Sequence, residues 1–322
     1  MTDQNDGFFT DLGNTKPYLK AAFEGFAGCG KTYTMAQIAV GLHQRIKSTK
    51  PVVIFDTEKA AKFLKHFFAE KGIKVLHKES RSLADLKETM KRCREGASDV
   101  LLIDSITHVW ENFIEAYRRD KNRTRLQFED WGTIKPKWKL EFSEPFVRDP
   151  YHTLMTGRAG YEYDDEKDEN GKRQIFKAGI KMKVEGETAY EPDILVLMSR
   201  FEELLEDNKK VWREATIVKD RSTIIDGKTF KNPTYDNFKP AIERILEDAV
   251  TGAAPVERDA ADLLNEVAKE FVEQFASATT KEQVDAITKE VTVKREQLNG
   301  GRDRVAAARA DALKRVEAPA AS

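Results

Sequence analysis

A chain of 322 residues with 40% hydrophobic content is long enough to bury one large core, with or without a small appended domain. Its 54 basic and 55 acidic residues give a net charge of -1, which excludes a global positive field that would draw it to DNA or to a membrane surface. The sequence shows neither an apolar run of membrane length nor a secretory signal, so we expect a cytoplasmic protein without membrane contact. Its two cysteines and five histidines lack the spacing of a structural zinc site.

The first third of the chain alternates predicted strands with predicted helices. Residues 18–24 form the first expected strand, a glycine-rich loop follows, and apolar residues at helical spacing predict a helix over 32–46. The alternation continues with strands at 52–55, 73–76 and 100–103 and with helices at 60–72, 82–94 and 106–117. Ser82 and Asp85 are expected to cap the helix that they open. This alternation predicts an α/β fold with a mainly parallel sheet and helices on both faces.

The pattern changes after residue 118. A basic, aromatic-rich stretch leads to a short strand at 153–156 and to a hairpin over 161–183 that turns at Asn170-Gly171. A second antiparallel pair is expected from 194–198 and 212–218, and a helix over 240–250 closes this part.

Composition divides the chain into a core and a small C-terminal helical module. TGAAP at 251–255 is typical of a linker, and the segment beyond it is rich in Ala, Glu, Lys and Arg with apolar residues at helical spacing. Thr280 and Gln283 are expected to cap one of its helices. The predicted division is a flexible tail, a nucleotide-binding core, a linker, a helical module and a short tail, at 1–16, 17–250, 251–255, 256–316 and 317–322.

The segment GFAGCGKT matches the phosphate-binding motif GxxxxGK[ST] and stands between a predicted strand and a predicted helix. Glycines let such a loop curl so that its backbone N–H groups and the helix N-terminus surround the β-phosphate. Lys31 is expected to reach the β- and γ-phosphates, and the Thr32 hydroxyl to bind Mg²⁺. ATP and Mg²⁺ are thus the expected cofactors, and the nucleotide-binding residues are Gly25, Phe26, Ala27, Gly28, Cys29, Gly30, Lys31 and Thr32.

The general base is not adjacent to the magnesium ligand. Asp104 follows the apolar strand at 100–103 and is the natural residue to hold the metal from its outer coordination sphere. The next residue, Ser105, cannot take a proton from water at neutral pH. The preceding central strand ends at Asp56-Thr57-Glu58, and the carboxyl ends of neighbouring parallel strands face the same phosphates. Glu58 is therefore the candidate base.

These features resemble the RecA-like recombinase fold, in which the magnesium aspartate is often followed by serine and the base lies where Glu58 lies. The order GFAGCGKT, IFDTEKA, LLIDSITH, DWGTI, LMTGRAGYEY and IVKDRS is similar to that of single-domain RecA-like ATPases of bacteriophages, which act in single-strand annealing and recombination. The resemblance covers roughly residues 16–246. It implies a RecA-like P-loop ATPase core that works in the cytoplasm of an infected bacterial host.

The resemblance also implies catalytic roles for four residues. Thr156 or Arg158, at the end of a central strand, would sense the γ-phosphate; alternatively, Arg158 pairs with the acidic hairpin. Lys219 and Arg221 lie two residues apart at a strand end and so on one face, similar to the KxR pairs that RecA-like helicases insert into the ATP site of a neighbouring subunit. A solvated strand end has the same pattern.

A basic cluster with interleaved aromatic residues is the candidate site for single-stranded DNA. Cations that meet phosphates beside aromatic rings that stack on bases are what non-specific binding of single strands uses. An acidic arm at 164–169 argues against DNA binding, and the alternative is a solvated helix face with tryptophans in the core. The cluster comprises Arg118, Arg119, Lys121, Arg123, Arg125, Phe128, Trp131, Lys135, Lys137, Trp138 and Lys139.

The favoured function is that of an ATP-hydrolysing phage recombination protein that binds single-stranded DNA. It would act as a homo-oligomer, a ring or a filament, with ATP between subunits, and its helical module would bind a partner such as a single-strand-binding protein. Two alternatives stay open: a phage helicase loader or small motor, and an ATP-dependent switch that binds a protein and never contacts DNA.

Overall fold

The computed structural model describes residues 17–167, 173–205, 208–247, 260–294, 298 and 302–317. The chain divides into two compact units, Met1–Ala254 and Pro255–Ser322, and each is described by itself. The predicted tail at 1–16 and the linker at 251–255 lie outside the described residues. In the described part of the chain, no helix combines the length and the apolar character that crossing a membrane requires.

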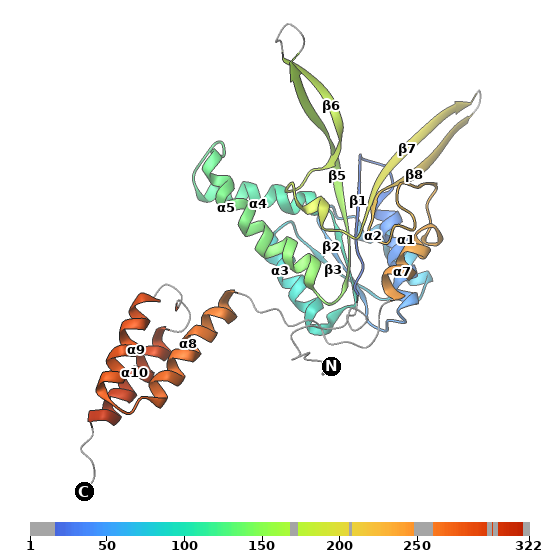
Figure 1. The fold of residues 1–322 in the computed structure, drawn as a ribbon. Helices are drawn as coiled ribbons and strands as arrows, with labels where there is room; N and C mark the ends of the chain where they lie inside the picture. The colour runs from blue at the N-terminus through green and yellow to red at the C-terminus, as the bar shows by residue number, and fades with distance from the viewer. Residues whose placement is uncertain are drawn as a thin grey trace, which may run out of the picture. The chain divides into compact units, whose positions relative to one another are not determined.

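The larger unit is built on one sheet, which has nine strands within its described residues, in the order β3-β2-β4-β5-β1-β7-β8-β9 with β6 paired to β5 (Figure 1). Six strands run parallel, and β6, β8 and β9 add to them as antiparallel neighbours. The strands are β1 Lys20–Gly25, β2 Val52–Asp56, β3 Val75–Glu79, β4 Val100–Asp104, β5 His152–Lys167, β6 Arg173–Met182, β7 Ile194–Leu205, β8 Asn208–Asp220 and β9 Thr229–Lys231.

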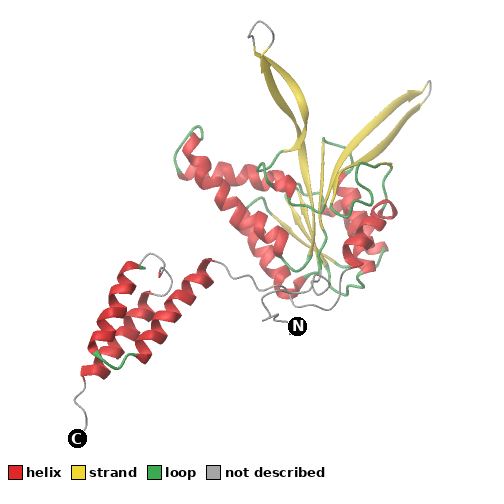
Figure 2. Ribbon diagram, viewed as in Figure 1, coloured by secondary structure: helices red, strands yellow, loops and turns green. Residues whose placement is uncertain are grey.

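Helices cover both faces of this sheet (Figure 2). One face packs against α1 Lys31–Arg45, α2 Ala61–Glu70 and α7 Tyr235–Glu247, and the other against α3 Leu83–Arg92, α4 Ile106–Asp120, α5 Trp131–Trp138 and α6 Glu144–Arg148. Successive strand residues point to opposite faces, so Ile54 and Leu102 join the first core and Phe55 and Ile103 the second. The predicted fold class, an α/β core with a mainly parallel sheet and helices on both faces, is confirmed.

Two hairpins extend from the sheet as arms (Figure 1). Gly25, the last residue of β1, pairs with Arg158 in β5 and with Met198 in β7, and both strands continue past it. The β5–β6 hairpin is the one predicted over 161–183, although its Asn170-Gly171 turn lies outside the described residues. The β7–β8 hairpin is longer than predicted because pairing continues to Leu205 and Asn208. Both arms therefore leave the sheet at the edge that carries the glycine-rich loop.

Three local predictions are wrong. β3 begins at Val75, two residues late. Ser82 makes no side-chain cap, because the Asp85 carboxylate that was to complete the capping box accepts a hydrogen bond from Ser80 Oγ at 2.5 Å instead. The last helix of the unit starts at Tyr235 and not at Pro240, because the Asn237 side chain accepts the Thr234 N–H at 2.8 Å and fixes an earlier start.

The smaller unit consists, in its described residues, of α8 Ala260–Ser277, α9 Lys281–Val293 and α10 Arg302–Glu317. Phe271, Phe275 and Val284 form its buried core with apolar residues of α10. Thr280 and Gln283 make the predicted capping box: the Gln283 N–H donates to Thr280 Oγ1 at 3.4 Å, and the Thr280 N–H donates to Gln283 Oε1 at 3.3 Å. The predicted helical module is thus present, with a core of its own.

Candidate active site

The loop between β1 and α1 depends on glycine at two positions. A Cβ atom on Gly25 would lie 2.4 Å from the carbonyl oxygen of Met198, so no other residue fits there. Gly30 has φ 95°, a left-handed conformation that L side chains rarely adopt, and it turns the chain directly into α1. The result is a tight loop that ends at a helix N-terminus, where free backbone N–H groups favour an anion.

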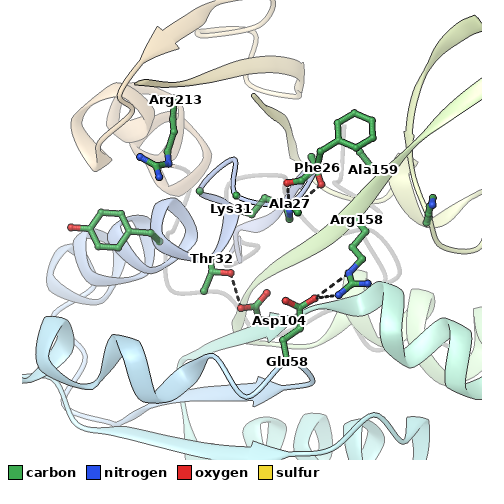
Figure 3. Close-up of a pocket in the computed structure, with 14 residues that line it drawn as sticks. Phe26, Ala27, Lys31, Thr32, Glu58, Asp104, Arg158, Ala159 and Arg213 are labelled. Carbon is green, nitrogen blue, oxygen red and sulfur yellow. Dashed lines mark hydrogen bonds and ion pairs between the residues drawn. The ribbon is translucent and has the colours of Figure 1, made fainter. Parts of the chain in front are cut away.

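Lys31 lies folded over this loop (Figure 3). Its Nζ atom donates to the carbonyl oxygens of Gly25 and Phe26, both at 2.9 Å. Cys29 is buried, with 1% of its surface exposed, and its Sγ atom is 3.7 Å from Lys31 Nζ. Since these partners of Lys31 are uncharged carbonyl groups and a thiol, phosphate oxygens would be stronger partners for its ammonium group.

A carboxylate shared by two hydroxyl groups forms the centre of the site. Asp104 Oδ2 accepts the Thr32 hydroxyl at 2.8 Å, and Oδ1 accepts the Thr156 hydroxyl. Burial raises the pKa of Asp104, the two threonine hydroxyls oppose that shift, and nearby carboxylates add to it. Mg²⁺ prefers oxygen ligands such as hydroxyl and carboxylate groups. Those of Thr32 and Asp104 are already in contact, so the two residues fit the predicted metal site.

Glu58 reaches the same site from the end of β2. Its backbone N–H donates to Asp56 Oδ1 at 3.0 Å, which fixes the turn after the strand. Its side chain is not free, because Glu58 Oε1 accepts from Nη2 of Arg158 at 3.0 Å and from Nε at 3.2 Å. The predicted base and a predicted γ-phosphate sensor are thus joined in an ion pair. The alternative partner of Arg158, the acidic arm at 164–169, has side chains that lie outside the described ones and stays untested.

A buried hydrogen-bond network supports the turn that carries Glu58. Thr57 Oγ1 contacts His108 Nδ1 at 2.8 Å and accepts the backbone N–H of Ser105 at 2.8 Å. Burial and the nearby Arg158 charge lower the pKa of His108, which favours the neutral ring. The Ser105 hydroxyl is buried and makes no hydrogen bond to any described residue. Ser105 therefore has no access to a bound water, whereas Glu58 does.

The glycine-rich loop lines a cavity of about 630 Å³ together with Glu58, Asp104 and Arg158. This volume is within the size range of small-molecule sites. Sequence reasoning missed Lys183 and Arg213 because both reach the cavity only through strand pairing far along the chain. Tyr33, Lys183 and Arg213 complete a lining that comprises Gly25, Phe26, Ala27, Gly28, Gly30, Lys31, Thr32, Glu58, Asp104, Arg158 and Ala159.

Lys219 and Arg221 lie away from this cavity. Lys219 pairs with Leu195 in β7, which lies beside Ala22 near the start of β1, whereas the loop follows the end of β1. Arg221 Nη1 is 3.2 Å from Asp193 Oδ1, and Lys219 Nζ donates to a main-chain carbonyl. Lys219 and Arg221 therefore lie towards the amino ends of the parallel strands, and the loop follows the carboxyl end of β1. A role for the pair in a neighbouring subunit stays a prediction.

The basic cluster is less available than its sequence indicates. Trp138 is fully buried and donates its indole N–H to Thr188 Oγ1 at 3.0 Å, and Trp131 packs against the same core. Arg118 and Arg119 pair with Glu115, and Arg123 pairs with Asp130. Phe128, with 89% of its surface exposed, is the accessible aromatic residue in the described part of this cluster.

Comparisons with known proteins add little beyond the fold. No family model matches the chain, and no curated protein matches it. Among solved structures, a KaiC-like protein from the hyperthermophilic archaeon Pyrococcus horikoshii is similar over 67% of this chain and 85% of its own, with 17% identity and a TM-score of 0.43. A likeness this distant identifies no function.

Replacing Lys31 tests the site as a whole. Lys31→Ala should weaken ATP and ADP binding by at least about 10-fold, because charge-assisted hydrogen bonds of roughly 1.5–3 kcal/mol to the phosphates are lost. Isothermal titration calorimetry with each nucleotide measures the effect, and Lys47→Ala, just beyond the far end of α1, is the control. Equal nucleotide affinity of Lys31→Ala and the wild type would contradict the assignment of this loop as a nucleotide-binding site.

Proposed function

We propose that this chain is an ATP-hydrolysing recombination protein that binds single-stranded DNA and acts as a homo-oligomer with ATP between subunits. The observation that carries the proposal is the single cavity that joins the glycine-rich loop, the Thr32–Asp104 pair and the Glu58 carboxylate. Binding, charge neutralisation and water activation are the three parts that phosphoryl transfer needs, and here each has a residue in place.

Hydrolysis then follows from rearrangement of the site's own side chains. Lys31 exchanges its carbonyl partners for the β- and γ-phosphates. Mg²⁺ held by Thr32 and Asp104 would neutralise charge on the same oxygens. Arg158 is drawn from Glu58 toward the γ-phosphate, and the released carboxylate orients a water and takes its proton. ATP thereby activates its own base, because without the phosphate the Arg158 ion pair occupies Glu58.

The separation of Lys219 and Arg221 from the cavity within one chain supports an oligomer. The cavity lies at one edge of the sheet, and Lys219 and Arg221 lie at the other. Cations at that position can reach a nucleotide only in a second copy, whose cavity edge must face them. Such a head-to-tail contact repeats, and it generates a ring when the rotation closes and a filament when it does not.

Single-stranded DNA binding is supported by the segment between α4 and α5. Phe128 presents an exposed ring, and the exposed Arg125 makes no ion pair with a described residue. An exposed aromatic ring three residues from a cation without an ion pair in the described part of the chain suits a base and a phosphate of a single strand. Arg118, Arg119 and Arg123 already form ion pairs within the chain. The proposed DNA-binding surface is therefore centred on Arg125 and Phe128.

The DNA part is tested by ATPase rate and by anisotropy of a labelled oligonucleotide. Single-stranded DNA should raise ATP turnover, and its binding should weaken steeply with salt because phosphate contacts release counterions. Phe128→Ala should lower DNA affinity by about 5-fold or more, the scale of one stacked base. Phe63→Ala, which removes another exposed ring, is the matched control.

Turnover without any oligonucleotide binding would instead support the protein-binding switch. Unwinding of a forked duplex would support the small motor.

Glu58→Gln should keep nucleotide affinity but reduce turnover by at least about 10²-fold, the scale of a general base. The amide preserves shape and can still accept from Arg158, so the change isolates the lost basicity. Ser105→Ala is the control and should leave turnover nearly unchanged. A normal rate in Glu58→Gln, or a large loss in Ser105→Ala, would contradict the assignment of the base.

Arg221→Ala should bind ATP yet hydrolyse it poorly, since a positioned arginine can contribute roughly 10³-fold to phosphoryl transfer. The decisive measurement mixes this variant with Lys31→Ala. Some interfaces then combine an intact loop with an intact Arg221, and part of the activity should return. No recovery from variants that demonstrably co-assemble would show that Arg221 does not act on a neighbouring subunit's ATP.

A further inference from the structure

Arg213, on β8, lines the nucleotide cavity without a partner of its own. It is exposed, and its guanidinium makes no hydrogen bond or ion pair with any described residue. Arg200, directly opposite on β7, is in contrast engaged, with Nη2 2.6 Å from Glu202 Oε1. Of two arginines on one face of the hairpin, the one that lines the cavity is therefore the one free to bind an anion.

The Arg213 side chain lies against the phosphate-binding loop. A Cβ atom built on Gly30 would be 2.6 Å from Arg213 Cδ and 3.0 Å from Nε. Gly30 directly precedes α1, so its backbone belongs to the helix N-terminus that cradles the α- and β-phosphates. Glycine at position 30 thus also makes room for Arg213.

Sheet order separates Arg213 from the catalytic groups. Glu58, Asp104 and Arg158 follow or belong to β2, β4 and β5, which all lie on one side of β1, whereas β8 lies on the other. Figure 3 shows the same separation, with Arg213 on one side of Lys31 and the Glu58–Arg158 pair on the other. A nucleotide whose γ-phosphate faces Glu58 has its α-phosphate and nucleoside toward Arg213.

We propose that Arg213 binds the α- and β-phosphates of the nucleotide held by its own chain. The inference rests on the proposed function, and it assigns a residue to the part of the nucleotide that is not transferred. A guanidinium offers five donors in a planar fork and can hold two phosphate oxygens in a fixed geometry, whereas Lys31 is assigned to the β- and γ-phosphates. Arg213 is thus a binding residue supplied in cis, distinct from the predicted trans role of Arg221.

The position of Arg213 determines which constants it affects. Contacts to the α- and β-phosphates are made in both ATP and ADP, so their loss weakens both nucleotides and raises KM. The effect on kcat should be small, because only the β-phosphate gains charge in the transition state. Contacts to the γ-phosphate would instead weaken ATP more than ADP and lower kcat. Comparing the two nucleotides therefore distinguishes the two ends of the site.

The experiment measures ADP and ATP affinity by calorimetry, together with KM and kcat, for the full-length chain. Arg213→Ala should weaken binding of both nucleotides about 10-fold, the loss expected for a charge-assisted hydrogen bond. It should raise KM to the same extent and leave kcat within about 2-fold of the wild type. The affinities of Arg213→Lys should lie between those of the wild type and of Arg213→Ala. Lys210→Ala, which removes an exposed cation of the same strand outside the cavity lining, should stay within about 2-fold of the wild type. Thermal unfolding confirms that each variant is folded.

Unchanged affinity in a folded Arg213→Ala variant would overturn the inference and leave the proposed ATPase standing. A selective loss of ATP binding or of kcat would also overturn it, because Arg213 would then act on the γ-phosphate. ADP binding needs no hydrolysis. If the wild type bound ADP but failed to hydrolyse ATP, the proposed function would fail while the Arg213 variants still decided this inference.

Discussion

The active site depends on the buried Asp104 carboxylate, which accepts one hydroxyl from Thr32 on α1 and one from Thr156 on β5. A buried carboxylate is costly unless hydrogen bonds satisfy it, so these contacts favour one arrangement of three elements. They also require β5 to lie between β1 and β4, as the observed strand order has it. One carboxylate thus links the helix after the loop, the end of β4 and the central strand β5.

The same strand then delivers the next functional group. Arg158 lies two residues beyond Thr156 and so on the same face of β5, where it meets Glu58 at the end of β2. Past this point β5 leaves the sheet as a long hairpin, and its return strand ends just before Lys183, whose N–H donates to the Arg158 carbonyl at 2.7 Å. The hairpin is therefore continuous with Arg158, which contacts the proposed base, Glu58.

Local patterns made much of this predictable from the sequence, and contacts across strands account for what was missed. The glycine-rich loop, Asp104 and Glu58 follow from motifs a few residues long and from the rule that parallel strand ends share an edge. Arg213 has no such signal, because only the long pairing of β7 with β8 brings it to Gly30. For Trp138 the sequence left a surface and a core position open, because its basic neighbours suit either, and packing between helices places it in the core.

Strand β8 combines the two arginine proposals in one rigid element. Arg213 and Lys219 are six residues apart, roughly 20 Å along a strand, and β7 and β9 pair with β8 on its two sides. If Arg213 binds its own chain's nucleotide and Lys219 and Arg221 reach the neighbour's, β8 spans two ATP sites. The pairing of β8 with β7 would then fix the separation of these two sites, with one irregularity of register opposite Leu195 and Val196 between them.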